Sequence, residues 1–580
     1  MNIIIITEKD AANVSMGRIS NEFACRGHNV RVFYPFFVES LKSDFDKNID
    51  MWPMDKLDDD ALKWCDLVFL SSIAVDHVNE ALLTVEKPIF VHSYMVNGQV
   101  DWGGDCRFVA SLETASMDYG NYFTHIDFAI GEPKYDTFKC QRENKKTNTF
   151  LFIDSGHFPF GKKGKIDLAR CILSICKTYP DYMLVIKPRF LPKDTVITHR
   201  NTQTLYDALL EESNGVLPAN LNYLDEHYDL MTLIERCDVV ICLYTSAYVG
   251  ACVANKGLVI LDGFESDDVY DVRRRNFEKI KRNMIYTNAL IDYREVNSVL
   301  PSGVNISDEA KRKLVSESDN VSNKIVEVVE YLFHCFYSKK KFPKINDYVY
   351  CEYKKNVEVD ENLDWQKVIE LRIRNYLMRQ SLIHFSFRLS TIIDVSEIIQ
   401  YVNSIDFKNI DIKKEIKNLL ELRSECLAKN KDLLIEDDID AGIVLNALYM
   451  LDRTDEILNF SRKDIGAFYL FAGFVYMDIG QEENARINLE KYFEITKDNP
   501  YIKEISDMSG NRFRAYDSLI NIYIDSDKMD EAIEYLNQME EYYKSFYRVG
   551  SLADEKVDVR QKNTAEMICE YKKKLQILKV

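Results

Sequence analysis

The segment from Met231 to Gly263 constrains the fold of this 580-residue chain more than any other. It reads MTLIERCDVVICLYTSAYVGACVANKGLVILDG and predicts a helix, a strand at Asp238–Leu243, a polar turn, a second helix and a strand at Leu258–Leu261. Both apolar runs are too short for a helix and show no polar alternation, which is typical of interior strands in a parallel sheet. Parallel strands need crossover helices, so we expect an α/β fold.

The polar turn within this segment contains Thr245 and Ser246. Hydroxyl groups and free backbone N–H groups at the positive end of a helix dipole bind a phosphate or diphosphate well. The alternative is that one of the two residues only caps the helix. The helix that follows has small residues that let it pack closely on a sheet: Ala247, Gly250, Ala251 and Ala254.

The same alternation of strands and helices begins at the N-terminus. Residues 2–6 and Val30–Tyr34 predict strands, and Val14–Gly27 predicts the helix between them. This order is typical of a doubly wound sheet, but no GxGxxG follows the first strand, so we do not expect a dinucleotide cofactor. Further strands are predicted at Leu67–Leu70, Pro88–His92 and Ile126–Ile130.

The pattern restarts after a polar linker at Gln141–Thr149. A strand at Phe150–Ile153, a glycine-rich basic turn at Ser155–Lys165, a helix at Ile166–Lys177 and a strand at Met183–Lys187 follow, and Leu221–Leu224 continues the series. Two tandem Rossmann-like units are therefore predicted. Their ligand cleft would lie between them, at the C-terminal ends of both sets of strands.

From about Ile306 the sequence no longer predicts strands. Ser322–Tyr337 has the apolar spacing of an amphipathic helix, and the remainder predicts helices. Spacings typical of tetratricopeptide units, whose matching residues pack paired helices together, recur near the C-terminus. The first copy has Ala472-Gly473, Tyr476, Gly480, Ala485 and Asn499-Pro500, the second has Leu519-Ile520, Tyr523 and Ala532, and a weaker one has Leu445 and Tyr449.

Composition excludes several classes of protein. The net charge of −19 argues against general nucleic-acid binding, and no run approaches the roughly 18 apolar residues of a membrane span. The 13 cysteines include no CxxC pair, so we expect neither a disulfide framework nor a zinc site. No secretory signal opens the sequence, which favours a cytoplasmic location. Asp58-Asp59-Asp60 reads as a helix start, and no metal site is expected.

Several residues at predicted strand ends and turns are candidates for chemistry. His92 ends a strand, and an imidazole there is suited to deprotonate an acceptor hydroxyl; the alternative is a structural histidine. Gly156 and His157 lie in the glycine-rich turn and are candidates for phosphate contact, with a solvated loop as the alternative. Glu8 and Asp10 follow the first strand and are weaker acid, base or acceptor candidates.

Basic residues at three places are candidates for anion binding. Lys187 and Arg189 flank a proline at a strand end, which aims two cations towards the predicted cleft; a surface salt bridge is the alternative. Arg273 and Arg274 suit either an anionic acceptor or a solvated helix face. Lys339–Lys344 reads as a solvated linker, or as a contact with an anionic membrane.

Over about residues 1–338, the tandem units, the Gly27-His28-Asn29-Val30 helix stop and the late phosphate-facing turn resemble the GT-B glycosyltransferases. The late motif of that superfamily has a hydroxyl pair, Glu-Ala, and Gly-Lys-Pro before an apolar strand. Thr245-Ser246 stands for the hydroxyl pair, and Gly250 stands where the Glu that commonly holds the donor ribose would be. The other matches are Ala251, Lys256 and Val259-Ile260-Leu261.

Two further turns are similar to those of capsule and teichoic-acid-type transferases. Lys187-Pro188-Arg189 resembles their Lys-Pro-His or Arg-x-His turn, with arginine in place of histidine. Val91-His92-Ser93 resembles their Trp-His-Gly turn, whose histidine is a candidate base.

The resemblance implies a metal-independent glycosyltransferase that moves a sugar from a nucleotide-activated donor to a hydroxyl of a surface-glycan precursor or a protein. The nucleotide-sugar is a substrate, and no cofactor is expected. His92 would act as the base, and four groups would stabilise the departing phosphate electrostatically. These four are Thr245, Ser246, Lys187 and Arg189.

The predicted fold class is thus α/β, with two Rossmann-like domains (GT-B) followed by an all-α, tetratricopeptide-like domain. The first domain (1–143) would face the acceptor, the second (144–338) would hold the donor and end in a crossover helix, and a linker (339–365) would lead to the helical domain (366–580). That last domain would bind the acceptor, a protein partner or a second copy. Peripheral contact with the inner membrane face is an alternative placement.

Two other functions stay open at this point. One is a transferase of glycerol phosphate or polyol phosphate that uses a CDP donor, as in teichoic-type enzymes. The other is an inactive GT-B scaffold that carries a tetratricopeptide interaction module, favoured by the missing Glu at Gly250.

Overall fold

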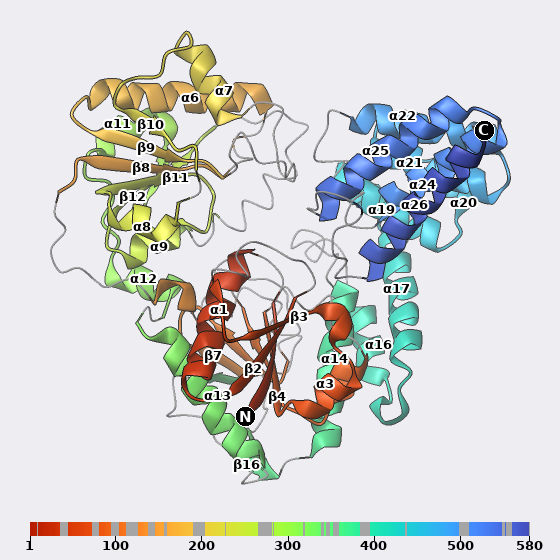
Figure 1. The fold of residues 1–580 in the computed structure, drawn as a ribbon, viewed down its shortest axis with the longest axis horizontal. Helices are drawn as coiled ribbons and strands as arrows, with labels where there is room; N and C mark the ends of the chain where they lie inside the picture. The colour runs from red at the N-terminus through yellow and green to blue at the C-terminus, as the bar shows by residue number, and fades with distance from the viewer. Residues whose placement is uncertain are drawn as a thin grey trace. The chain divides into compact units, whose positions relative to one another are not determined.

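A computed structural model shows that the chain forms two compact units (Figure 1). One contains residues 1–192, 203–380 and 402–412, and the other contains residues 193–202, 381–401 and 413–580. The structure describes residues 1–7, 10–34, 44–71, 80–93, 104–111, 126–136, 146–155, 159, 161–189, 204–226, 228–264, 281, 284–316, 319–337, 341–343, 349–351, 359–362, 364–382, 395–434, 438–497, 510–547, 552 and 559–578.

The first sheet has eight parallel strands in the order β15-β7-β6-β5-β4-β1-β2-β3. Its central strands are short apolar runs that are buried on both faces, such as the isoleucines of β1. Such runs form interior strands because every side chain loses contact with water on one face or the other. The strands are β1 Asn2–Ile6, β2 Asn29–Tyr34, β3 Asp50–Pro53, β4 Leu67–Ser71, β5 Ile89–His92, β6 Cys106–Val109, β7 Ile126–Ala129 and β15 Val349–Cys351.

Helix α1 (Asp10–Cys25) packs on one face of this sheet, where the ring of Phe23 lies edge-on to Phe69 at 6.3 Å. Helix α13 (Val321–Tyr337) packs beside α1, and Figure 1 shows α3 (Asp59–Trp64) and α14 (Trp365–Leu382) on the opposite side of the sheet. The predicted helix start at Asp58 is confirmed, since its carboxylate caps α3. The short elements are η1 Met54–Lys56, α4 Glu80–Thr84 and η4 Pro133–Tyr135.

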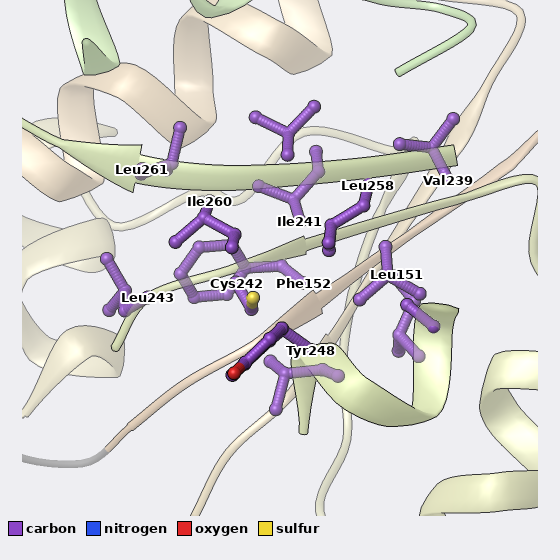
Figure 2. Close-up of a cluster of buried hydrophobic side chains, with 14 of the residues drawn as sticks. Leu151, Phe152, Val239, Ile241, Cys242, Leu243, Tyr248, Leu258, Ile260 and Leu261 are labelled. Atoms are coloured by element: carbon purple, nitrogen blue, oxygen red, sulfur yellow. The ribbon is translucent and has the colours of Figure 1, made fainter. Parts of the chain in front are cut away.

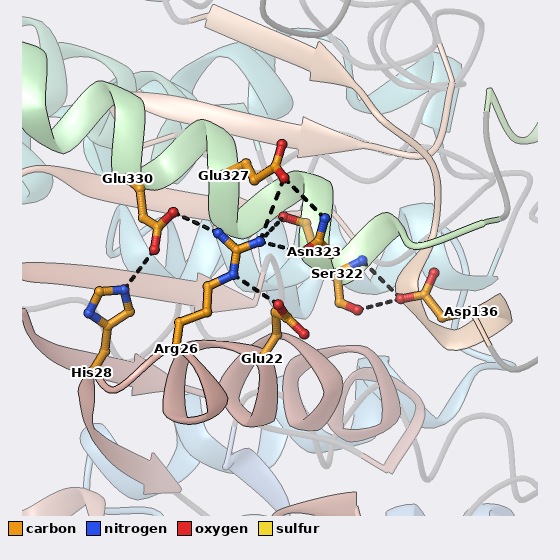
Figure 3. Close-up of polar contacts among 8 residues, drawn as sticks. All are labelled: Glu22, Arg26, His28, Asp136, Ser322, Asn323, Glu327 and Glu330. Carbon is orange, nitrogen blue, oxygen red and sulfur yellow. Dashed lines mark hydrogen bonds and ion pairs between the residues drawn. The ribbon is translucent and has the colours of Figure 1, made fainter.

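Polar contacts fix α13 to the first sheet although α13 follows the second sheet in the chain (Figure 3). Arg26, at the end of α1, donates to Glu330 at 2.7 Å and to Asn323. At the N-terminus of α13, the Asp136 carboxylate accepts from the backbone N–H groups of Val321 and Ser322 at 2.7 and 2.9 Å. This cap satisfies amides that begin the helix. The predicted crossover helix is therefore part of the first α/β layer.

The segment after α13 also belongs to the first sheet, because β15 pairs in parallel with β7. The prediction that strands end near Ile306 is wrong, since β14 (Lys341–Pro343) and β16 (Val359–Asn362) form a further antiparallel pair. Strands of only three or four residues give too short a pattern to be recognised in a sequence.

The second sheet has six parallel strands in the order β10-β9-β8-β11-β12-β13. The strands are β8 Thr149–Ile153, β9 Met183–Lys187, β10 Leu221–Tyr223, β11 Val239–Cys242, β12 Gly257–Asp262 and β13 Leu290–Asp292. Helices α6 (Gly161–Thr178), α7 (Leu205–Glu212) and α11 (Val296–Val299) lie together, as do α8 (Leu230–Glu235), α9 (Tyr248–Val253) and α12 (Asp308–Leu314) (Figure 1). The turn η6 spans Tyr293–Glu295.

Strands β8, β11 and β12 form the centre of the hydrophobic core around the second sheet, called here the second core (Figure 2). Phe152, Ile241 and Ile260 each have 0% of their surface exposed. The Met231–Gly263 segment folds as predicted, with helices on both sides of β11 and β12. The basic turn predicted at Ser155–Lys165 is partly wrong, because α6 already begins at Gly161.

The second unit is helical. Helices α21 and α22 pack as one pair, and α24 and α25 as another. Residues at matching positions of the two copies are buried: Ala485 and Ala532 at 0%, and Leu489 and Leu536 at 0% and 3%. The paired helices agree with the predicted spacing, and the tetratricopeptide assignment stays a prediction. The connection between the two units contains α16 Ser396–Ser404 and η7 Phe407–Asn409. The helices that follow are α17 Ile412–Lys429, α18 Lys431–Leu434, α19 Asp438–Met450, α20 Thr454–Leu458, α21 Gly466–Asp478, α22 Glu482–Thr496, α24 Asn511–Asp525, α25 Met529–Tyr547 and α26 Val559–Leu578.

Two parallel Rossmann-like sheets followed by a helical region confirm the predicted fold class. The predictions missed β3 and β6, because Asp50–Pro53 and Cys106–Val109 contain charged residues or proline within four positions. The central strands with uninterrupted apolar runs were predicted to within two residues of their observed ends.

Candidate functional site

A row of polar side chains crosses the C-terminal end of the first sheet. Register places Ser71 beside His92 on the neighbouring strands β4 and β5, and Thr7 follows β1 on the other side of β4. The equivalent row two residues earlier contains Phe69 and Phe90, so the polar row continues an apolar face of the sheet. Thr7, Ser71 and His92 each have 0% of their surface exposed.

Glu132 joins this row from the turn that follows β7. Its Oε1 atom lies 3.8 Å from His92 Nε2 and accepts a hydrogen bond from Ser15 of α1. All three side chains are fully buried. The predicted base is therefore placed in a closed environment beside a carboxylate. A carboxylate beside an imidazole can stabilise the cation that forms when the ring accepts a proton.

Two cations lie where β9 ends on the second sheet. Lys187 is partly buried and Arg189 is exposed. Burial lowers the pKa of Lys187, while the nearby Asp229 carboxylate opposes this shift and Arg189 adds to it. Asp229 also caps α8 by accepting from Thr232 N at 2.7 Å. Burial disfavours the charged form of Lys187, so a negatively charged ligand near the amine would stabilise that form.

A third cation, Lys165, was not among the predicted site residues. It lies in the first turns of α6 with 1% of its surface exposed, and its Nζ atom is 3.9 Å from Asp154 Oδ1 at the end of β8. Burial lowers the pKa of Lys165, and the Asp154 carboxylate partly opposes the shift. A lysine near a helix N-terminus is electrostatically unfavourable, because the positive end of the helix dipole favours negative charge there.

The turn with Thr245 and Ser246 differs from the prediction. The N-cap of α9 is Ala247, which has no side-chain cap, and Thr245 Oγ1 only accepts a long bond of 3.4 Å from the Ala247 amide. The alternative that Thr245 or Ser246 serves only as the N-cap of this helix is therefore wrong. Helix α9 has only six residues, so its dipole is a weak attraction for a phosphate. Thr245 is partly buried and Ser246 is exposed.

Gly250 stands where the resemblance places a glutamate, and a side chain added there would meet apolar and aromatic groups. A Cβ atom at this position would lie 3.0 Å from Ile234 Cδ1, 3.5 Å from Met231 Cε and 3.6 Å from Tyr135 Cε1. The direction in which a side chain would leave the helix is filled by apolar and aromatic groups. Glycine has no side chain, so position 250 of this chain offers no carboxylate to a ribose.

The remaining predicted residues fall outside what the structure describes: Glu8, Gly156, His157, Arg273, Arg274 and the side chain of Asp10. Within the described ranges, no group of three or more histidine, cysteine, aspartate or glutamate side chains is arranged to hold a metal ion. None of the helices in those ranges has the length and apolarity needed to cross a membrane.

Sequence reasoning missed Ser15, Ser71, Glu132 and Lys165. Ser71 and Glu132 had a usable signal, since Ser71 ends an apolar run of strand length and Glu132 follows such a run after one glycine. Ser15 and Lys165 had none, because a single polar residue in a helix does not reveal which face it occupies until the helix is packed.

No protein-family model matches the chain, and no curated protein matches it. Solved structures with a similar arrangement include the UDP-GlcNAc 2-epimerase of Methanocaldococcus jannaschii, with 10% identity and a TM-score of 0.40 over 57% of this chain and 100% of that one. Acinetobacter baumannii MurG is similar at 12% identity and a TM-score of 0.35, over 57% of this chain and 99% of that one. The calicheamicin glycosyltransferase CalG4 is similar at 12% identity and a TM-score of 0.37, over 57% and 98%.

Proposed function

We propose that this protein is a glycosyltransferase that moves a sugar from a nucleotide-activated donor to a hydroxyl acceptor without a metal ion. One observation carries the proposal: the C-terminal ends of the two parallel sheets hold complementary chemistry. The first sheet presents a histidine beside a carboxylate, and the second presents buried or partly buried lysines. Ligands of doubly wound folds bind at these ends of the strands.

In the proposed reaction, the acceptor oxygen forms a bond to the anomeric carbon of the donor sugar while the bond from that carbon to the diphosphate oxygen breaks. His92 takes the proton of the acceptor hydroxyl. Glu132 stabilises the imidazolium that results, since its Oε1 atom is within 3.8 Å. Lys187, Arg189, Thr245 and Ser246 stabilise the charge of the departing nucleoside diphosphate.

A donor-hydrolysis screen with the full chain tests this proposal. UDP-, GDP- and CMP-sugars are incubated with the protein, and release of free nucleotide is measured. Release from one donor, abolished in His92→Ala and reduced in Lys187→Ala, is the expected result. CDP-glycerol is included because the same cations suit a polyol-phosphate transferase, and release from that donor alone would assign the protein to that class.

The packing around Gly250 favours one alternative, an inactive scaffold that retains the fold. Without the ribose contact, donor affinity must come from the diphosphate and the base alone. Binding of a nucleotide-sugar with no turnover of any donor, at protein concentrations well above the dissociation constant, would support the scaffold and contradict the transferase.

A further inference from the structure

We propose that the buried polar cluster on the first sheet, defined here as Ser15, Ser71, His92 and Glu132, binds the hydroxyl groups of an uncharged sugar or polyol. This inference names the acceptor class and rests on the proposed function for its role in transfer. The binding itself can be tested without any transfer reaction.

The first argument is the hydrogen-bonding state of the cluster. Ser71 Oγ and Glu132 Oε2 are buried, and neither makes a hydrogen bond to any residue that the structure describes. A buried polar atom without a partner costs about 1–3 kcal/mol of folding free energy, and more when the group is charged. Native proteins pair most such atoms, so two of them within one cluster indicate groups kept for a ligand.

The second argument is geometry. Ser71 and His92 are directly opposite each other on adjacent parallel strands, which are about 4.8 Å apart in any sheet. Glu132 lies 3.8 Å from His92 and is oriented by the hydroxyl of Ser15. The unpartnered hydroxyl and the unpartnered carboxylate oxygen therefore flank the predicted base. A hydroxylated group bound between them would present one of its oxygens to His92.

The third argument is chemical complementarity. A carboxylate only accepts hydrogen bonds, whereas a serine hydroxyl both donates and accepts. A molecule with neighbouring O–H groups matches this set, because one hydroxyl donates to Glu132 while another exchanges a bond with Ser71. The cluster contains no lysine or arginine. Arg18, outside the cluster, interacts electrostatically with Glu132 and donates to the Pro133 carbonyl at 3.0 Å. The carboxylate therefore disfavours a phosphorylated acceptor.

Binding to the full chain tests the proposal. The probes are glycerol, ribitol, glucose and N-acetylglucosamine, with glycerol 3-phosphate and glucose 6-phosphate as their anionic counterparts. Saturation-transfer NMR and calorimetry measure binding, and thermal unfolding without ligand measures stability. We expect at least one uncharged probe to bind, with a dissociation constant that rises at least fivefold in Ser71→Ala. The anionic counterparts should bind more weakly than their uncharged partners.

The unfolding temperature separates a ligand role from a structural one. Alanine at position 71 removes a hydroxyl that has no partner, so Ser71→Ala should unfold at the same temperature as the wild type or higher. Tyr248→Phe is the matched control: its hydroxyl is equally buried and lacks a described partner, but it belongs to the second core. This variant should leave probe binding unchanged.

Three outcomes would overturn the proposal. A lower unfolding temperature for Ser71→Ala together with no binding of any uncharged probe would mean that Ser71 only holds an ordered water. Stronger binding of the phosphorylated probes would exclude the uncharged class. Sugar transfer that is unaffected by Ser71→Ala would contradict the proposed binding site but not the proposed transferase function. Probe binding without sugar transfer from any donor would instead support the binding site and contradict the proposed transferase function.

Discussion

His92 Nε2 lies 3.8 Å from Glu132 Oε1, and neither side chain has any exposed surface. The two residues come from different strand ends, and Ser15 of a helix on the sheet fixes the carboxylate. Replacing Glu132 by glutamine keeps its shape but removes the charge. If the pair performs base catalysis, Glu132→Gln should lower kcat by about 10²-fold and leave the donor KM within twofold, because general-base catalysis contributes about 10²–10⁴ to the rate.

Steady-state kinetics on the donor found in the hydrolysis screen measure this split. Ser15→Ala is the control variant, since it loosens the carboxylate without removing its charge and should cost less than Glu132→Gln. An equal loss of kcat and of folded protein in Glu132→Gln would show that the pair is only structural.

Lys187 predicts proton uptake when a nucleoside diphosphate binds. In the ligand-free protein, burial holds the pKa of this amine below its ordinary value, and a phosphate beside it would raise that pKa again. At alkaline pH values between the free and bound pKa, the amine is partly neutral before binding and charged afterwards. Calorimetry with UDP in two buffers of different ionisation enthalpy should show net uptake that vanishes well below this window. Lys187→Met should abolish the uptake, and uptake that persists in this variant would assign the proton to another group.

The packing around Gly250 predicts that the glutamate expected from the resemblance would destabilise the fold. The nearest atom to an added Cβ is the flexible end of Ile234, so Gly250→Ala should change stability by no more than about 1 kcal/mol, since helix propensity offsets the contact. Gly250→Glu should be destabilising by several-fold more, because it buries a carboxylate beside Met231 and Tyr135. Thermal unfolding of the two variants measures the difference. Tighter binding of a nucleotide-sugar by Gly250→Glu would contradict this account.

The contacts of Arg372 on α14 predict that this helix, which the sequence analysis assigned to the helical domain, is needed for the stability of the first domain. Its five N–H donors are all used, by both carboxylate oxygens of Asp105 and by three carbonyls. These carbonyls belong to Leu83, Val85 and Lys87. Arg372→Met leaves the Asp105 carboxylate buried without its ion pair and should destabilise the protein by about 3–5 kcal/mol.

Arg372→Lys distinguishes charge from geometry in the same experiment. Lysine keeps the charge but has three donors instead of five, so it should recover only part of the loss. A full recovery would show that charge alone holds α14 to the sheet. Arg374→Lys, on the same helix, is the control and should have little effect.

Gly473 predicts close packing within the helix pair α21–α22. A Cβ at this position would lie 2.6 Å from Leu489 Cδ2, and Leu489 is fully buried. Gly473→Ala should therefore cost about 1–3 kcal/mol through overpacking. Gly442→Ala in α19 is the matched control, because its Cβ would meet only Ala467 Cβ at 3.3 Å and it gains about 1 kcal/mol of helix propensity. Opposite shifts in unfolding temperature are expected, and two shifts of the same sign would contradict the packing.

The sequence alone determined the fold class and most strand positions. Runs such as Ile3–Ile6 and Val239–Cys242 must be buried on both faces, and only a covered parallel sheet provides that. It also indicated His92 and Lys187 as candidates, since strand ends of a doubly wound sheet face ligands. These inferences depend on local hydrophobic pattern, which the sequence records directly.

Tertiary structure alone decided which polar groups share an environment. Glu132 and His92 are 40 residues apart, and Ser15 lies on a helix, so only strand order and helix packing bring them together. The sequence likewise could not predict that α13 and β15 return to the first sheet. Their contacts, with Asp136 and with β7, join residues that are far apart in the chain. Local pattern fixes which residues are buried, whereas contacts between distant residues depend on the free energy of the whole assembled layer.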